Sequence, residues 1–364
     1  MILLAVVAAV VCIGQTPAPA LANDAWRAVQ ERRADDAERL FQQLTSQRPD
    51  DARAWAGFAA AALLRGRDSD ARVRLERALA LDPADAEAAL LLSDLFFRQS
   101  RPVDAIRTLE RARAAGATAP RLIARLEQLL AEHTLHARFN QSLNGRFTVL
   151  FEGAPEASLA GVVLEHLDAA WARLAQTLFT PPAGPITVTL YTEQQFTDIT
   201  RAPAWAAAAF DGRIRLPVRG ALQDRAELDR VLTHELAHAF VRAAAPRGVP
   251  MWLDEGIASM VEPRDLEWAR GEVQRAGRLL PPARIQRSFR DLSGDDARLA
   301  YAQSGLLVRA IVDRHGAGAL NALLSDLGRG VPFDAAFRAR AFETWPAFLS
   351  RFASELSVPY DEDR

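Results

Sequence analysis

The stretch His234-Glu235-Leu236-Ala237-His238 combines side chains that can bind a metal ion and move a proton. Residues four positions apart on a helix share one face, so His234 and His238 can present imidazole nitrogens to one metal ion. Glu235 projects beside them, where its carboxylate can take a proton from a metal-activated water. The pattern H-E-x-x-H therefore indicates a metal site with a general base. The alternative is a buried helix whose histidines are four residues apart by chance.

Two histidines leave a zinc site one protein ligand short, because catalytic sites have three protein ligands and an open position for water. A third histidine, as in metzincins, is excluded because Val241 and Ala244 stand at the positions that the metzincin pattern requires. We expect Glu255 to be the third ligand, from a second helix in which the small Gly256 permits close approach. The neighbouring Asp254 should point about 100° away from Glu255, so only one of the two can face the metal. A solvated Glu255 is the alternative.

The HELAH segment and the segment PMWLDEGIASM at 250–260 together resemble the gluzincin metallopeptidases. The resemblance is strongest to the peptidase MA-like domain, in which H-E-x-x-H is followed by Pro-x-Trp-Leu-x-Glu-Gly-x-Ala. It implies one zinc ion per chain, with His234, His238 and Glu255 as ligands and Glu235 as the catalytic base.

A later segment, residues 298–312, resembles the helix that follows the zinc site in peptidase MA-like domains. Its Tyr301 could donate a hydrogen bond to the oxyanion of peptide hydrolysis, as a tyrosine does in several gluzincins. A half-buried helix tyrosine without a catalytic role is the alternative. His315, followed by Gly316, is typical of a helix C-terminus.

A repeat with a period of 34 residues runs through the first part of the chain (70 − 36 = 34; 104 − 70 = 34). The matching positions are Asp36-Ala37, Asp70-Ala71 and Asp104-Ala105; Phe41, Leu75 and Leu109; and Leu44, Ala78 and Ala112. This period resembles the tetratricopeptide repeat, in which each helix pair buries its apolar face on the next pair. We therefore expect a helical solenoid over residues 23–132, with a partial first unit and residues 121–132 as a capping helix. Its concave face binds a protein partner or the substrate in one interpretation, and it is a packing platform in the other.

The rest of the chain is predicted to form a domain at 147–356, after a polar linker at 133–146 and before an acidic, frayed tail at 357–364. Local patterns predict three strands and two helices: strands 147–151, 186–191 and 214–216, and helices 155–178 and 193–199. This order is similar to the N-terminal lobe of gluzincins. The resemblance implies that residues 212–217 form the sheet edge that runs beside the zinc and pairs with the substrate.

These elements predict an α+β fold. It consists of an N-terminal α-helical tetratricopeptide solenoid followed by a zincin-like domain with a small mixed β-sheet, an active-site helix and a helical C-terminal lobe.

The N-terminal residues predict export. Residues 2–13 are apolar but too short to span a bilayer, which takes about 20 residues. Ala20-Leu21-Ala22 then offers a cleavage site, so residues 1–22 are expected to be a signal peptide, although no basic residue precedes the apolar run. We expect a periplasmic or secreted bacterial protein with no stable membrane span after cleavage.

The composition is that of a globular protein: 364 residues, 49% hydrophobic and 25% charged, with a formal net charge of −2. This charge balance gives no indication of nucleic-acid binding. Cys12 is the single cysteine and lies in the predicted signal peptide, so the mature chain has no disulfide and no thiolate metal ligand. The sequence thus predicts an exported zinc-dependent peptidase that hydrolyses peptide bonds and binds a partner or substrate through its repeats. The alternative is a catalytically silent, zinc-containing envelope scaffold that acts through the repeats.

Overall fold

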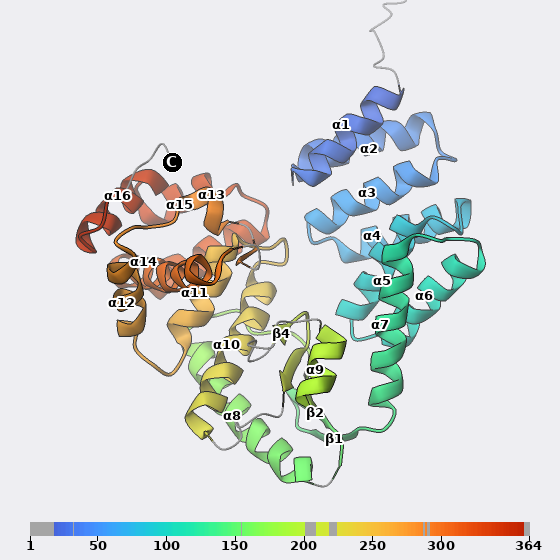
Figure 1. The fold of residues 1–364 in the computed structure, drawn as a ribbon. Coiled ribbons are helices and arrows are strands. Elements are labelled where there is room, and N and C mark those ends of the chain that lie inside the picture. Colours follow the sequence, from blue (N-terminus) through green and yellow to red (C-terminus); the bar gives the residue numbers. More distant parts are fainter. Residues whose placement is uncertain are drawn as a thin grey trace, which may run out of the picture. The chain divides into compact units, whose positions relative to one another are not determined.

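A computed structural model describes residues 18–31, 33–153, 155–200, 209–217, 224–286, 288–289 and 292–359. The chain divides into two compact units. The first comprises residues 1–95 and 104–123, and the second comprises residues 96–103 and 124–364. The expected combination of helical repeats with an α+β domain is confirmed (Figure 1).

Seven helices make up the repeat region: α1 (Ala18–Gln30), α2 (Ala34–Gln47), α3 (Ala52–Leu64), α4 (Asp68–Leu81), α5 (Ala86–Arg98), α6 (Pro102–Ala114) and α7 (Pro120–His136). The first helix of each pair starts 34 residues after the one before (52 − 18 = 34; 86 − 52 = 34; 120 − 86 = 34). The predicted period is therefore confirmed. The first unit is a complete helix pair, α1 and α2, where the sequence pattern indicated a partial one.

The repeated positions form the interior of the solenoid. Phe41, Leu75 and Leu109 are fully buried, as the stacking of successive helix pairs requires. The contact between α2 and α3 depends on Gly57, because a Cβ atom there would lie 2.1 Å from the ring of Phe41.

The predicted cleavage site lies in a packed helix. Residues 1–17 of the predicted signal peptide are outside the described residues, but Ala20-Leu21-Ala22 belongs to α1. Leu21 is buried in a cluster with Ala25, Ala28 and Phe41. Cleavage after Ala22 would therefore remove the first turn of α1. Among the described helices, none combines the length and the apolar character that crossing a membrane requires.

The second unit is built on a five-stranded sheet with the order β1-β2-β3-β5-β4. Its strands are β1 (Asn140–Leu143), β2 (Phe147–Phe151), β3 (Ile186–Tyr191), β4 (Ala209–Phe210) and β5 (Ile214–Pro217). β2, β3 and β5 are parallel, and β1 and β4 pair antiparallel at the two ends. The three predicted strands are confirmed.

Strands β1 and β4 were not expected from the sequence. β1 lies within residues 133–146, the predicted linker, and its polar residues carry no alternating pattern. The side chain of Asn144 makes the turn that follows, since its Oδ1 accepts hydrogen bonds from the amides of Arg146 and Phe147 at 2.9 and 2.8 Å. Backbone pairing, which is independent of side-chain type, holds this strand to the sheet.

The predicted sheet edge is wrong in its position. Residues 212–217 were expected to form the edge, but β4 pairs outside β5 through Phe210 with Ile214 and Ala209 with Arg215. Gly212 allows this return because its φ of 106° lies in a region that side chains rarely adopt. The described edge at this end of the sheet is therefore β4.

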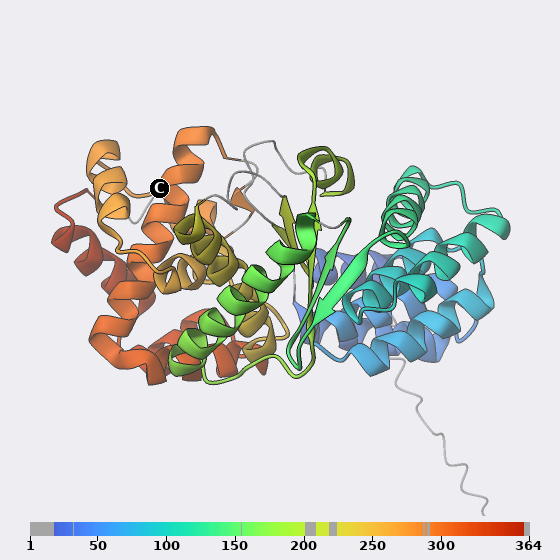
Figure 2. The ribbon, with the colours of Figure 1, turned by 90° about the horizontal axis from the view of Figure 1, so that it is seen from below.

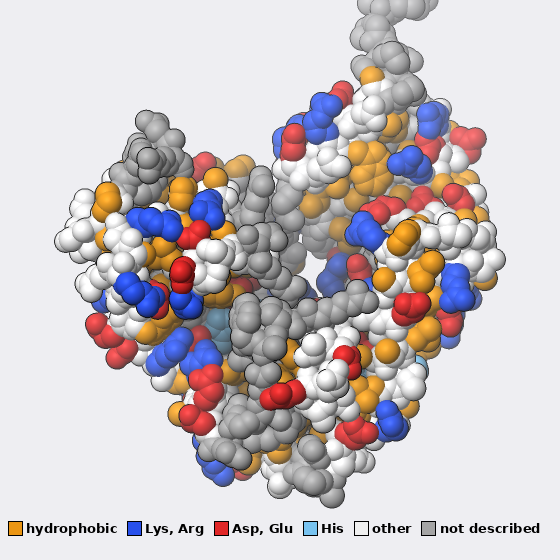
Figure 3. All heavy atoms as spheres, in the orientation of Figure 1, with side chains coloured by type: hydrophobic (Ala, Val, Ile, Leu, Met, Phe, Trp, Pro, Cys, Tyr) orange, Lys and Arg blue, Asp and Glu red, His pale blue; other side chains and the backbone are white. Residues whose placement is uncertain are grey.

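Helices cover the sheet and complete the second unit: α8 (Pro155–Thr177), α9 (Glu193–Thr200), α10 (Arg225–Ala244), α11 (Met251–Val261), α12 (Glu267–Ala276), α13 (Pro282–Ile285), α14 (Gly294–Gly328), α15 (Phe333–Ala341) and α16 (Trp345–Glu355). α8 packs on β2 and on α10, and α14 packs on α11 (Figure 2). The predicted helix end at His315 is a break, because Gly316 has non-helical angles and the helix resumes after it. On the face in Figure 3, acidic and basic side chains of the described residues are interspersed.

Candidate metal centre

Helix α10 carries His234, Glu235 and His238. Asp224 begins this helix as its N-cap, since its Oδ1 accepts hydrogen bonds from the amides of Ala226 and Glu227 at 3.0 and 3.1 Å. The helix periodicity then places both histidine rings on one face, with their ring centroids 5.0 Å apart. The HELAH segment is therefore helical, as its spacing requires.

Helix α11 brings Glu255 to the two histidines. The helix is anchored by Trp252, which is buried and stacks on Trp345 with a centroid separation of 4.8 Å. Behind Glu255, a Cβ atom on Gly256 would lie 2.4 Å from the carbonyl oxygen of Ser304 on α14. Glycine at this position thus lets α11 lie directly on the α14 backbone and sets the position of Glu255.

The three predicted ligands converge. One potential ligand atom from each of His234, His238 and Glu255 lies within 4.8 Å of the others. Glu255 Oε2 is 3.3 Å from His234 Nε2 and 3.8 Å from His238 Nε2. Zinc–nitrogen and zinc–oxygen bonds of about 2.1 Å in a tetrahedron place ligand atoms about 3.4 Å apart, so the observed spacing suits zinc.

A second observation supports a cation at this point. Glu255 Oε2 is buried and has no aligned hydrogen bond to a described residue. A buried carboxylate oxygen without a hydrogen bond is costly, and a metal ion would satisfy it. Two imidazoles and one carboxylate are also a donor set that zinc commonly takes in catalytic sites.

The other nitrogen of each histidine is held by a carboxylate. Glu262 Oε1 lies 2.8 Å from His234 Nδ1, and Asp254 Oδ1 lies 2.9 Å from His238 Nδ1. When Nδ1 carries the proton and donates it to the carboxylate, the Nε2 lone pair is free for a metal. The arrangement therefore orients both rings toward Glu255.

These two supporting carboxylates were not predicted. Asp254 does point away from the metal position, as its place beside Glu255 implied, but it has a role of its own in orienting His238. Glu262 caps the end of α11 and belongs to no motif in the sequence. The signal that could have identified both carboxylates is their position relative to Glu255. Asp254 lies next to it on α11, and Glu262 lies two turns further on, at the end of the same helix.

Glu262 is itself tightly held. Its side chain is 2% exposed, and Arg230 and Arg264 lie 3.2 and 2.7 Å from its carboxylate oxygens. Burial alone would raise the pKa of Glu262, but the hydrogen bond from His234 and the charges of the two arginines hold it below its usual value. The Glu262 carboxylate therefore stays ionised beside His234.

The centre favours positive charge. Burial disfavours a charged imidazole, yet the carboxylates of Glu255 and Glu262 raise the pKa of His234 to about 10. Burial likewise opposes a charge on His238, and Asp254 raises its pKa. Both shifts come from the negative charge of the carboxylates around the two rings, and a metal cation would balance that charge.

Glu235, the predicted general base, lies near the two histidines. It is buried, at 8% exposure, and it makes no hydrogen bond to another described residue. Burial raises the pKa of Glu235, while the nearby His234 and His238 act in the opposite direction. A carboxylate with a raised pKa accepts a proton more readily at neutral pH than a solvated one.

Tyr301 lies on α14, one turn before Ser304, whose carbonyl approaches Gly256. Its ring is half-buried and packs edge-on against Phe289, with the centroids 5.1 Å apart. The group of three metal-ligating residues does not extend to it, and its proposed role toward the oxyanion stays a prediction.

The short strand β4 runs beside the centre. The ring of Phe210 faces that of His238 at 6.3 Å with an interplanar angle of 20°. Arg242 lies one turn after His238 on α10. Its guanidinium lies over the Phe210 ring, 5.1 Å from the ring centroid. The described edge strand beside the candidate metal site is thus β4 and not residues 212–217, where the edge was expected.

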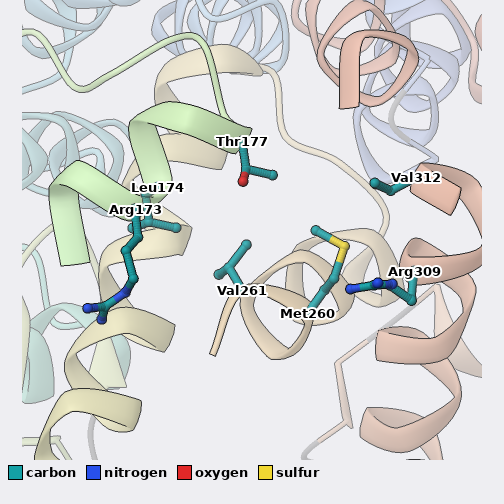
Figure 4. Close-up of a pocket in the computed structure, with 7 residues that line it drawn as sticks. All are labelled: Arg173, Leu174, Thr177, Met260, Val261, Arg309 and Val312. Carbon is teal, nitrogen blue, oxygen red and sulfur yellow. The ribbon is translucent and has the colours of Figure 1, made fainter. Parts of the chain in front are cut away.

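A separate pocket of about 270 Å³ opens between α8, α11 and α14 (Figure 4). It is lined by Arg173, Leu174, Thr177, Met260, Val261, Arg309 and Val312. None of the predicted ligands or catalytic residues lines it.

Solved structures with a similar chain include the type III secretion translocator chaperone SycD of Yersinia enterocolitica. In its alternative dimer it is 20% identical, over 34% of this chain and 96% of that chain, with a TM-score of 0.31. SycD in complex with a peptide of the translocator YopD gives 20% identity, coverages of 34% and 97%, and a TM-score of 0.31. These low scores carry no argument about this chain. No curated protein matches it.

Family models match both parts of the chain. Residues 28–77 and 69–132 match the tetratricopeptide repeat. Residues 167–344, which include α10, α11 and α14, match the peptidase MA superfamily. Both resemblances seen in the sequence are confirmed: the chain carries tetratricopeptide repeats followed by a domain of the peptidase MA superfamily.

Proposed function

We propose that the protein is a zinc-dependent peptidase that hydrolyses peptide bonds. The observation that carries this proposal is the convergence of His234 Nε2, His238 Nε2 and Glu255 Oε2 beside the buried carboxylate of Glu235. Membership of residues 167–344 in the peptidase MA superfamily supports the same reading.

In the proposed reaction, the metal ion and the residues of the chain have different roles. A zinc ion, when bound, would polarise a peptide carbonyl and lower the pKa of water, so that the water can lose a proton and attack the carbonyl carbon. Glu235 accepts the proton of the attacking water and passes it to the leaving amine. His234, His238 and Glu255 hold the ion, and Tyr301 donates a hydrogen bond to the carbonyl oxygen as charge develops on it.

The repeats suit a binding role in this scheme. Three helix pairs and the capping helix α7 repeat with one period, and such arrays expose extended surfaces for other proteins. We propose that they bind a protein partner or the substrate. The apolar residues 2–13 support export, and we propose a periplasmic or secreted location.

A second candidate function gives the repeats the working role. In this scheme the zinc site stabilises a fold that acts as an envelope scaffold without turnover. The regular, fully packed repeat array favours it, because such arrays bind proteins without catalysis.

The substitution Glu235→Gln separates the two functions. Glu235 is not among the converging ligands, so this variant should keep one zinc per chain and fold normally. Hydrolysis of an unfolded protein substrate should fall by about a hundredfold or more, since general acid–base groups contribute about a hundred- to ten-thousand-fold.

Glu267→Gln is the matched control, because Glu267 lies exposed on α12 and should leave activity unchanged. Equal hydrolysis by the wild type and Glu235→Gln would remove the peptidase proposal. Zinc-loaded wild type without turnover would favour the scaffold.

A further inference from the structure

A buried cluster of charged side chains lies between α7 and the sheet, and the proposed chemistry does not use it. Glu132 of α7 is 3% exposed. Its two carboxylate oxygens accept hydrogen bonds from Arg215 of β5 at 2.8 and 3.2 Å. Arg213 lies 3.7 Å from the same carboxylate and is also buried. One carboxylate thus holds two guanidinium groups of the β4–β5 hairpin.

The rest of the cluster completes the pairing. Arg215 also donates hydrogen bonds to the hydroxyl of Tyr191, at 2.9 Å, and to Asp211, at 3.2 Å. The ring of Phe97 faces the guanidinium groups of Arg213 and Arg215 at 4.7 and 5.7 Å. Two carboxylates therefore balance two guanidinium groups. Removing one partner leaves a buried charge uncompensated, which is much more disruptive than losing an exposed ion pair.

The same hairpin lies against the metal helix on its other side. Phe210 of β4 pairs with Ile214 of β5, and its ring faces that of His238. At the turn, a Cβ atom on Gly212 would lie 3.1 Å from Arg242 of α10. The hairpin is thus packed between the Glu132 cluster and the helix that carries the histidines.

We propose that Glu132 is a positioning residue for the candidate metal centre. By holding Arg213 and Arg215, it fixes the β4–β5 hairpin, whose Phe210 limits the movement of the His238 ring. The buried carboxylate of Glu132 is suited to this because Arg213 and Arg215, which are also buried, keep a balancing charge only while they stay beside it. Helix α7, which the repeat pattern assigns to the solenoid, is then a working part of the metal-binding unit.

The inference also rests on the proposed function where substrate is concerned. β4 is the described edge of the sheet at the end beside His238, so its position decides how an extended peptide meets the proposed zinc site. Loss of Glu132 should therefore affect substrate binding more than the chemical step.

The test compares Glu132→Gln with Glu127→Gln in the full chain. Glu127 lies on the same helix and is exposed, so its variant should match the wild type. In Glu132→Gln, amide hydrogen exchange over residues 209–217 should be about tenfold faster or more, because the hairpin loses its anchor. Zinc affinity should also fall. The decrease should be smaller than that caused by losing a carboxylate bonded directly to a ligating histidine, which is about tenfold to hundredfold. KM for a peptide should rise by about tenfold, with a smaller change in kcat.

A compensating variant distinguishes positioning from general stabilisation. Glu132→Gln leaves one guanidinium unpaired, whereas Glu132→Gln with Arg213→Gln restores the balance between Arg215 and Asp211. The double variant should recover slow hairpin exchange and much of the zinc affinity. If Glu132→Gln does not fold, Arg213→Gln replaces it and should show the same changes to a smaller degree.

Wild-type hairpin exchange and zinc affinity in a folded Glu132→Gln protein would overturn the inference, even with a lower melting temperature. A wild-type protein that binds zinc but hydrolyses no peptide would remove the proposed function alone. Hairpin exchange and zinc affinity would then still decide the role of Glu132.

Discussion

The two supporting carboxylates should contribute unequally to zinc binding. Loss of a carboxylate that orients a ligating histidine typically weakens metal binding by about tenfold to hundredfold, which is about 1.4 to 2.7 kcal/mol. Asp254 is 33% exposed, so water screens its hydrogen bond to His238 and we expect the lower end of this range for Asp254→Ala. Glu262 is 2% exposed and is flanked by two arginines, so Glu262→Gln should approach the upper end. Glu255→Ala should have a larger effect than either, because it removes a direct ligand.

Competition with a chromophoric chelator would measure these zinc affinities. Asp334→Ala is the matched control, since Asp334 is an exposed acidic residue in the first turn of α15, as Asp254 is in the first turn of α11. Its affinity should equal that of the wild type. An Asp254→Ala affinity within twofold of wild type, a difference of about 0.4 kcal/mol, would show that this hydrogen bond does not orient the ring. An effect as large as that of Glu255→Ala would transfer the ligand role to Asp254.

Three further predictions concern the histidine ligands, Tyr301 and the buried His136. His234→Ala and His238→Ala should each lose stoichiometric zinc in elemental analysis, and full zinc in both variants would exclude this site. Tyr301→Phe should keep zinc and lower kcat by about a hundredfold or less, and an unchanged rate would remove its oxyanion role. Burial lowers the pKa of His136 from 6.5 to about 4, so the folded state resists its protonation. The contribution of the neutral His136 to the free energy of unfolding should be fully present above pH 6.5. It should fall by up to about 3 kcal/mol as the pH drops to 4. Urea unfolding at several pH values should show this loss, and His136→Gln should reduce it.

The metal site was largely predictable because its chemistry is local. His234 and His238 share a face on any helix, and the α10 helix forms as its N-cap and apolar positions require. Glu255 was placed by resemblance, and the structure brings its carboxylate to the two Nε2 atoms. The role of each residue in catalysis stays a prediction.

The partners of these residues were not predictable. The contact of Glu262 with His234 depends on where along its length α11 packs against α10. The close contact of Gly256 with α14 fixes that position. Helix geometry allowed only one of Asp254 and Glu255 to face the metal, but the bond of Asp254 to His238 depends on how the two helices are rotated. The rotation of the two helices and the position at which they pack are results of tertiary packing, and no short motif encodes them.

The sequence by itself determined the repeat period, the three apolar strands and the H-E-x-x-H helix. Each of these depends on contacts between near neighbours in the chain or on a regular spacing of apolar residues. Only the tertiary structure decided that β1 and β4 exist, because a polar or two-residue strand gains its stability from backbone pairing with a partner. It also decided that Glu132 of α7 meets Arg215 of β5. A buried charge is stable only when distant parts of the chain supply its partner, so its place is known only once the chain is folded.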